Sequence, residues 1–351
     1  MLTLKLMSIA LLSYLSIKLV QKQAVRLDFL DLPNERSQHV EVLPRGAGVG
    51  FVFAFFIGCL ICYPSVFLID RWMFVSILIV FIAGIIDDHH GISARFKFFT
   101  IFLAVYILWM DNYSIYTLGT WFGHRIDLPW WIALPFGMFA IAGLTNALNL
   151  IDGLDGLAGG VSIVIFCTFW FIGLKHHDHS IVMISSVMLF SLCGFMLLNW
   201  NPAKIFMGDS GSLTLGFVIS ILSMLSIHYI PPVVTLYLGA LPVLDTLIVM
   251  VRRYRRGKSP FHADKTHMHH ILVRFFENNV KKTVLFLIIL QTIFSTSGYI
   301  LIGVIQHDTT GWVPFGAFVG FGLIFVLFYM IFTGIQKRQL AVDKMNKINL
   351  P

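Results

Sequence analysis

Long apolar segments recur along the whole chain and constrain its fold more than any other feature. The hydrocarbon core of a bilayer is about 30 Å thick, and a helix crosses it in about 20 residues. The chain has eleven apolar segments of roughly this kind, at about residues 2–20, 48–69, 72–86, 97–110, 129–147, 158–174, 180–198, 212–228, 230–250, 283–305 and 312–335. They lack the alternation of membrane-barrel strands. The sequence therefore predicts an all-α, polytopic membrane protein with about eleven transmembrane helices.

The composition excludes other classes of protein. Only 12% of the 351 residues are charged, 57% are apolar and the mean hydropathy is +0.82, whereas soluble domains carry about 25% charged residues. A soluble enzyme and a disordered chain are both excluded. We expect one integral-membrane domain over residues 1–351, with a cytoplasmic loop for substrate recognition at 251–282 and a cytoplasmic tail at 336–351.

The distribution of Lys and Arg predicts the orientation. Basic residues resist translocation and stay on the cytoplasmic side. All but four of the 25 Lys and Arg residues fall after odd-numbered segments or in the C-terminal tail, and the four exceptions are Lys5, Arg71, Arg125 and Lys175. The N-terminus is therefore predicted outside and the C-terminus inside. The net charge of +7 reflects this asymmetry and an attraction to anionic lipids and phosphates, so nucleic acid is not needed to explain it.

Acidic motifs follow three of the segments, all on the predicted cytoplasmic side. Asp87-Asp88 follows the third segment, Asp152-Gly-Leu-Asp155-Gly the fifth, and Gly208-Asp209-Ser-Gly the seventh. Each has a simpler interpretation as a solvated helix end, a glycine-rich turn or a helix cap. Adjacent carboxylates at a membrane boundary are nevertheless costly without a compensating cation. Mg²⁺ takes carboxylate oxygens and brings substrate phosphates with it.

Basic residues and histidines accompany these acids. Lys97 follows the paired acids, and a basic run from Arg252 leads to His267, His269 and His270. Zinc is the alternative for the histidines, but there is no H-x-x-x-H pair, so hydrogen bonding to a phosphate or sugar is favoured. The chain has no P-loop or kinase motif set. Taken alone, the residues indicate metal-dependent phosphoryl chemistry on a lipid.

The ordered motifs DLPNERSQH, PRGAGVG, GIIDDHHGISARFK, NALNLIDGLDGLAGG, FMGDSGSLTLGF and RRYRRGKSPFHADKTHMHHIL closely resemble those of the polyprenyl-phosphate N-acetylhexosamine-1-phosphate transferases, glycosyltransferase family 4. The resemblance implies an eleven-helix enzyme of the bacterial inner membrane with a cytoplasmic active site. Such enzymes transfer a sugar 1-phosphate from a UDP-sugar to undecaprenyl phosphate and release UMP. The RRYRRGKSPF stretch favours the branch that uses UDP-GlcNAc to initiate O-antigen and other cell-envelope polysaccharides. The branch using UDP-MurNAc-pentapeptide is the alternative.

The resemblance also implies roles for individual residues. Asp87, Asp88, Asp152 and Asp155 are expected to be catalytic, and Asp87, Asp88 and Asp209 to bind Mg²⁺, with Mn²⁺ as the alternative. Expected substrate-binding residues are Arg45, Lys97, Asn149, Asn199 and the carbohydrate-recognition histidines His267, His269 and His270. Ala47 departs from the glycine often found at that position of the family.

Other functions and assemblies are left open. A membrane transporter would place its acids near mid-bilayer, often within inverted repeats, whereas here they cluster at one face and no repeat is visible. A lipid diphosphate phosphatase would also use such acids. The oligomeric state is not fixed, with a homodimer as one expectation. Direct attack by the lipid phosphate is favoured over an aspartyl-phosphate intermediate.

Overall fold

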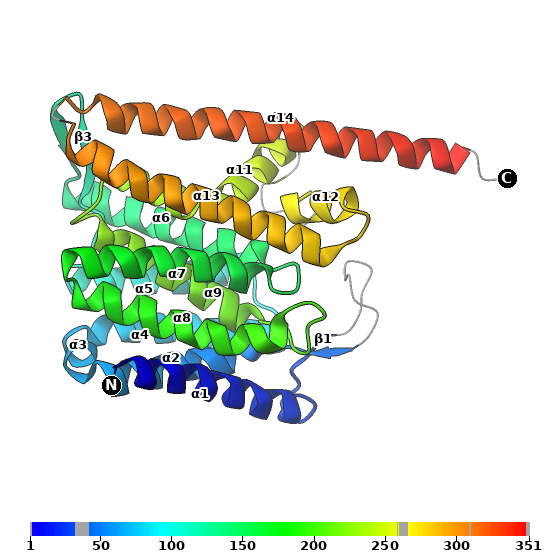
Figure 1. The fold of residues 1–351 in the computed structure, drawn as a ribbon, viewed down its shortest axis with the longest axis horizontal. Coiled ribbons are helices and arrows are strands. Elements are labelled where there is room, and N and C mark those ends of the chain that lie inside the picture. Colours follow the sequence, from blue (N-terminus) through cyan, green and yellow to red (C-terminus); the bar gives the residue numbers. More distant parts are fainter. Residues whose placement is uncertain (1, 32–41, 258, 260–265, 309, 349–351) are drawn as a thin grey trace.

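The computed structural model describes residues 2–31, 42–257, 259, 266–308 and 310–348, and its helices lie side by side in a bundle (Figure 1). The helices are α1 (Leu2–Gln23), α2 (Ala47–Cys62), α3 (Pro64–Ile69), α4 (Arg71–His90), α5 (Ala94–Met110), α6 (Trp130–Ile151), α7 (Leu157–His176), α8 (His179–Asn199), α9 (Asp209–Ser226), α10 (Pro232–Leu238), α11 (Ala240–Arg255), α12 (Met268–Phe275), α13 (Val280–Gln306) and α14 (Trp312–Ile348). Within the described ranges, the strands form only two short antiparallel pairs, β1 (Leu30–Asp31) with β2 (Leu43–Pro44) and β3 (Thr117–Trp121) with β4 (His124–Asp127). The predicted all-α membrane fold is confirmed.

Each predicted apolar segment is helical, although two of them are broken. Among the described residues, eight helices are long and apolar enough to cross a membrane. The pair α10 and α11, which bends by 84° at Gly239, would be a ninth. The segment predicted at 48–69 divides into α2 and α3 where Pro64, which has no N–H to donate, begins α3. The count of eleven crossings and the orientation stay predictions.

Helix α9 is the centre of the bundle and α14 is its edge. In an apolar 18-residue stretch of α9, 89% of the residues are buried, whereas only 17% are buried in the corresponding stretch of α14. Glycines let two neighbours approach the first turn of α9 closely. A Cβ on Gly84 of α4 would lie 2.5 Å from the Cα of Ser210, and a Cβ on Gly48 of α2 would collide with the backbone N of Gly211. These contacts fix the ends of α2 and α4 against the start of α9.

The loops that carry the acidic motifs lie at one end of the bundle. In Figure 1 the C-terminal end of α4, the turn from α6 to α7, the start of α9 and helix α12 all lie toward the right, whereas α3 and β3 lie at the left. The chain starts at the left and α14 ends beyond the right-hand end. The 336–348 part of the predicted tail is a continuation of α14. Segments far apart in the sequence therefore share one end of the molecule.

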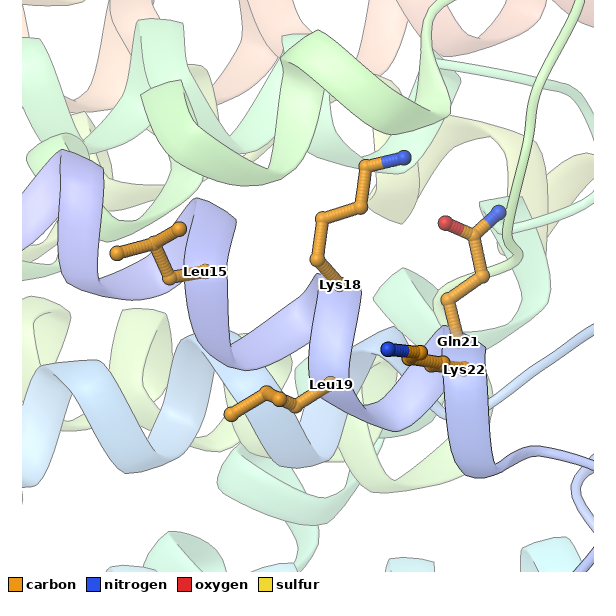
Figure 2. A pocket seen from close by; sticks show the side chains of 5 residues that line it. All are labelled: Leu15, Lys18, Leu19, Gln21 and Lys22. Carbon is orange, nitrogen blue, oxygen red and sulfur yellow. The ribbon is translucent and has the colours of Figure 1, made fainter.

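The outer face of α1 carries an open groove of about 600 Å³, lined by Leu15, Lys18, Leu19, Gln21 and Lys22 (Figure 2). The two leucines are 50% and 60% exposed. Close to the lysines, the Gln21 amide donates to the Lys204 carbonyl in the loop between α8 and α9 (2.8 Å). An apolar strip that ends in ammonium groups is typical of a helix at the level of lipid headgroups. This indicates that the end of the bundle with the acidic loops lies at a membrane surface.

We predict that Gly84→Ala lowers the stability of the protein by about 1–3 kcal/mol, since a methyl group would overpack the contact with α9. Gly143→Ala in α6 is the matched control, because a Cβ there meets no atom within 4 Å. Thermal melting of both variants in detergent, followed by tryptophan fluorescence, measures the difference. Equal melting temperatures for the two variants would contradict the close approach of α4 and α9.

Candidate functional site

Asp88, in the last turn of α4, binds the N-terminus of α9. Its Oδ1 accepts the N–H of Asp209 (2.8 Å) and its Oδ2 accepts the N–H of Ser210 (3.0 Å). The first N–H groups of a helix have no partner within the helix and favour an anion. Gly208 stands at φ +77°, and a Cβ there would lie 2.7 Å from Asp88 Oδ2. Arg45 adds an ion pair to Asp88 Oδ1 (3.4 Å) and also donates to the Asp88 carbonyl.

Asp87 and Asp209 share one cation, the Lys97 ammonium. Lys97 Nζ forms ion pairs with Asp87 Oδ2 and with Asp209 Oδ2, the latter at 3.2 Å. The other oxygen of Asp87 accepts the N–H of Ile92 (2.7 Å). Adjacent residues of a helix point about 100° apart, which is why Asp88 reaches α9 while Asp87 reaches α5. The predicted pair of acids therefore divides into two different sets of contacts.

Asn149, near the end of α6, completes the surroundings of Asp209. Its Nδ2 donates to Asp209 Oδ1 (2.7 Å) and lies 2.8 Å from Ser212 Oγ. The side chain of Asp209 is one-third exposed, whereas that of Asp88 is fully buried. Asp209 is therefore held by Asn149 and Lys97 while it stays accessible to a ligand.

Asp155 and Asn199 join the turn after α6 to the loop after α8. Asp155 Oδ2 accepts from Asn201 Nδ2 (2.8 Å) and from the N–H of Ala203 (3.0 Å). Asn199 Oδ1 accepts the N–H of Gly156 (2.9 Å), and its Nδ2 donates to the carbonyl of Ile205 (2.9 Å). Both side chains hold backbone segments in place, which is a positioning role.

Asp152 differs from the other acids because its carboxyl forms no hydrogen bond with any described residue. Burial, followed by the negative charges of Asp209, Asp88 and Asp155, raises the pKa of Asp152 to about 8. An unpaired carboxyl near three others is more stable when protonated. Asp152 is therefore able to exchange a proton close to neutral pH.

The predicted histidines lie at the start of α12, against the same turn. The His269 ring packs on Gly153, whose added Cβ would lie 3.0 Å from His269 Cε1. His267 and His269 stack with ring centroids 5.7 Å apart, and His269 and His270 are 4.2 Å apart. The contact with Gly153 places the histidines beside the turn that carries Asp152.

The donor set fits a divalent cation only in part. Asp87 Oδ2 is buried and, apart from its ion pair with Lys97, has no hydrogen-bond partner in the described ranges. It converges with Asp209 Oδ2 on one cationic group, and Mg²⁺ prefers such oxygens. Asp88 already uses both oxygens on α9. No group of three or more His, Cys, Asp or Glu side chains in the described part of the chain is arranged to hold a metal ion. Mg²⁺ commonly takes only one or two carboxylates and completes its shell with water and phosphate.

The structure brings together most of the residues expected from the sequence. Direct contacts join a central set of six, which are Arg45, Asp87, Asp88, Lys97, Asn149 and Asp209. Asp152, Asp155, Asn199 and the histidines surround the adjoining turn. Sequence reasoning missed Asp245, which binds His267 Nδ1 at 2.7 Å. A single acid inside the apolar segment at 230–250 was the available signal.

Fold and site together define a polytopic helical membrane protein with an acid-rich polar site at one end of its bundle. The model of glycosyl transferase family 4 matches residues 71–227. The "Probable undecaprenyl-phosphate N-acetylglucosaminyl 1-phosphate transferase" of Bacillus subtilis (strain 168) is 35% identical over 297 residues, covering 81% of this chain and 80% of the relative.

Two further relatives carry the name undecaprenyl-phosphate alpha-N-acetylglucosaminyl 1-phosphate transferase. The Escherichia coli (strain K12) protein is 34% identical and the Yersinia pestis protein 31% identical, each covering 77% of this chain and 76% of the relative. The chain belongs to glycosyl transferase family 4, and the resemblance inferred from its motifs is confirmed.

We predict that Asp152→Asn becomes more stable relative to wild type as the pH rises from about 4 to about 8. The pKa of Asp152 in the folded state lies above its value in the unfolded state. The protonated carboxyl therefore stabilises the folded wild type at low pH, and this contribution is lost as the pH rises toward about 8. Melting curves in detergent with EDTA across this range measure the effect.

Asp155→Asn is the control for this measurement. It disturbs two hydrogen bonds and should cost about 1–3 kcal/mol across the range. A difference between wild type and Asp152→Asn that does not change with pH would contradict the protonated carboxyl.

Proposed function

We propose that this protein transfers GlcNAc 1-phosphate from UDP-GlcNAc to undecaprenyl phosphate, giving undecaprenyl-diphospho-GlcNAc and UMP. The names of three relatives at 31–35% identity support this assignment. The bacterial inner membrane is the proposed location, with the site on the cytoplasmic face, which the distribution of Lys and Arg supports. Initiation of O-antigen synthesis and a homodimer stay predictions.

The observation that carries the proposal is the convergence of Asp87, Asp209 and Lys97 beside Arg45 and Asp88. Phosphoryl transfer depends mainly on alignment and on neutralisation of charge. Asp87 and Asp209 would hold Mg²⁺, which neutralises charge on the donor diphosphate when bound. Lys97 and Arg45 offset the charge of the acceptor phosphate. With this end of the bundle at the membrane surface, a lipid phosphate would meet a water-soluble donor there.

The reaction requires one P–O bond to form and one to break. An oxygen of undecaprenyl phosphate attacks the sugar-bearing phosphorus of the donor, and the bridging oxygen leaves with UMP. A phosphate monoester with a second pKa near about 6 is mostly dianionic at neutral pH, so a general base is optional. Asp152, with its pKa raised to about 8, holds its proton at neutral pH, so only its minor ionised fraction would act as a base. We therefore favour direct attack, and capture of a phosphosugar on the enzyme without lipid would reverse this preference.

The test uses the purified protein in detergent with undecaprenyl phosphate, Mg²⁺ and a panel of UDP-sugars that includes UDP-GlcNAc and UDP-MurNAc-pentapeptide. UMP release and the mass of the lipid product are measured. We expect UMP only when lipid phosphate and UDP-GlcNAc are both present. Release of UMP without lipid would indicate a hydrolase, and inactivity with every sugar would refute the proposal.

We predict that Asp87→Asn, Asp88→Asn and Asp209→Asn each lower turnover by on the order of a hundredfold or more. Asp87 and Asp209 would hold the cation that neutralises phosphate charge, and Asp88 holds the start of α9 that carries Asp209. Asp127→Asn is the control, because Asp127 pairs with Arg125 on the exposed β3–β4 hairpin at the other end of the bundle. Steady-state UMP release and melting temperature are measured for all four. Normal rates in the three site variants would remove the assignment of these acids.

A further inference from the structure

A buried acid outside the acidic motifs binds the start of α12. Asp245 of α11 is 1% exposed. Its Oδ2 lies 2.7 Å from His267 Nδ1, and its Oδ1 accepts the N–H of Met268 at 2.6 Å. An ionised carboxylate only accepts hydrogen bonds, so His267 Nδ1 carries the proton and Nε2 is the nitrogen left for a ligand. Asp245 thereby fixes both the orientation and the tautomer of His267.

Arg252, two turns further along α11, holds the residue before His267. Its Nη1 donates to the carbonyl of Thr266 (2.8 Å), and its Nε donates to Thr333 Oγ1 of α14 (3.1 Å). Residues seven apart lie on one face of a helix. One face of α11 therefore binds three consecutive residues, 266–268, and determines where α12 begins.

The anchored segment carries an imidazole with unused hydrogen-bonding capacity. His269 is 2% exposed, and neither of its ring nitrogens has a hydrogen-bond partner among the described residues. Burial, followed by the charge of His270, lowers the pKa of His269 to about 3, so its ring is neutral and offers one donor and one acceptor. A buried polar group left unpaired is costly, and such a group is satisfied when a water, an ion or a ligand binds it. The ring lies against Gly153, next to Asp152.

We propose that Asp245 is a positioning residue for the sugar-nucleotide donor. It acts through His267 and the start of α12, and so sets the position of the histidine rings beside the Asp152–Gly156 turn. This inference rests on the proposed function and adds to it a residue that touches no substrate. The ligand is the polar sugar and diphosphate part of a UDP-sugar. Its hydroxyl, amide and phosphate groups can form hydrogen bonds with a neutral or a charged imidazole. The lipid acceptor is not expected to depend on Asp245.

The first test is the steady-state kinetics of Asp245→Asn. The amide keeps the size of the carboxyl but offers an N–H to one of its two donors, so it opposes the Nδ1–H tautomer. We expect the KM for the donor to rise about ten- to a hundredfold, the effect of one lost charge-assisted hydrogen bond, with little change in the KM for undecaprenyl phosphate. Asp245→Glu, which keeps the charge, should recover part of the loss.

The second test combines Asp245→Asn with His267→Gln. If Asp245 acts through His267, the double variant should lose no more donor kcat/KM than His267→Gln alone, within about twofold. Losses that multiply would show that Asp245 acts independently of His267 and would overturn the inference.

Asp70→Asn is the matched structural control. Asp70 is 2% exposed and accepts hydrogen bonds from Tyr113 Oη (2.8 Å) and Ser180 Oγ (2.5 Å). It should lower the melting temperature without changing the donor KM. An Asp245→Asn variant with the same behaviour would show a purely structural role.

Different outcomes would overturn the proposed function and the positioning role of Asp245. A folded wild-type protein that is inactive with every UDP-sugar overturns the proposed function. An active wild-type enzyme whose donor KM is unchanged in Asp245→Asn overturns this inference alone. Hydrogen exchange of residues 266–275 gives a readout besides activity. We expect faster exchange across this segment in Asp245→Asn, since the charged acceptor that holds its start is lost, and unchanged exchange throughout the segment would count against the inference.

Discussion

The contact between the Asp88 carboxylate and the first N–H groups of α9 is the interaction on which the site depends. Helix α9 is central and almost wholly buried, so its N-terminal N–H groups require a partner in a region of low dielectric. Asp88 supplies it from α4, and Gly208 leaves room for the carboxylate. This contact brings Asp209 next to Lys97 and Asn149. The same bond that completes the helix therefore assembles the polar site.

The charge balance of the assembled site explains why it requires further cations or protons. Five acids gather around two basic side chains, Lys97 and Arg45, in the described part of the chain. Part of the excess is removed by protonation, because Asp152 holds its proton up to a pKa of about 8. A donor diphosphate and a lipid phosphate would add more negative charge. A single divalent cation would offset two of these negative charges. We propose a cation between Asp87 and Asp209 for this reason.

The sequence predicts the helical segments and the shared end of the acidic motifs, because both follow from hydropathy and from the alternation of crossings. It does not predict how individual acids are used. Asp88 and Asp155 read as equivalent members of acidic motifs, yet one caps α9 and the other holds the 201–203 backbone. Such roles depend on contacts between segments far apart in the chain. The bend of 84° between α10 and α11 was missed although Gly239 and Pro242 stand at it, because the segment at 230–250 has the length and hydropathy of a single crossing.

The Asp245–His267 pair shows that burial of charge at this end of the bundle serves geometry more than stability. Removing a carboxylate from water costs several kcal/mol, and the hydrogen bonds it accepts in the interior return about the same amount, so well-packed apolar residues would serve stability equally well. A hydrogen-bonded carboxylate does require one arrangement of its partners, which an apolar contact does not. The pair lies where α12 meets the turn that carries Asp152, and there a small displacement would move an imidazole relative to the donor. Alignment of substrates is the main contribution a protein makes to phosphoryl transfer, so a costly but precise contact is favoured at this position.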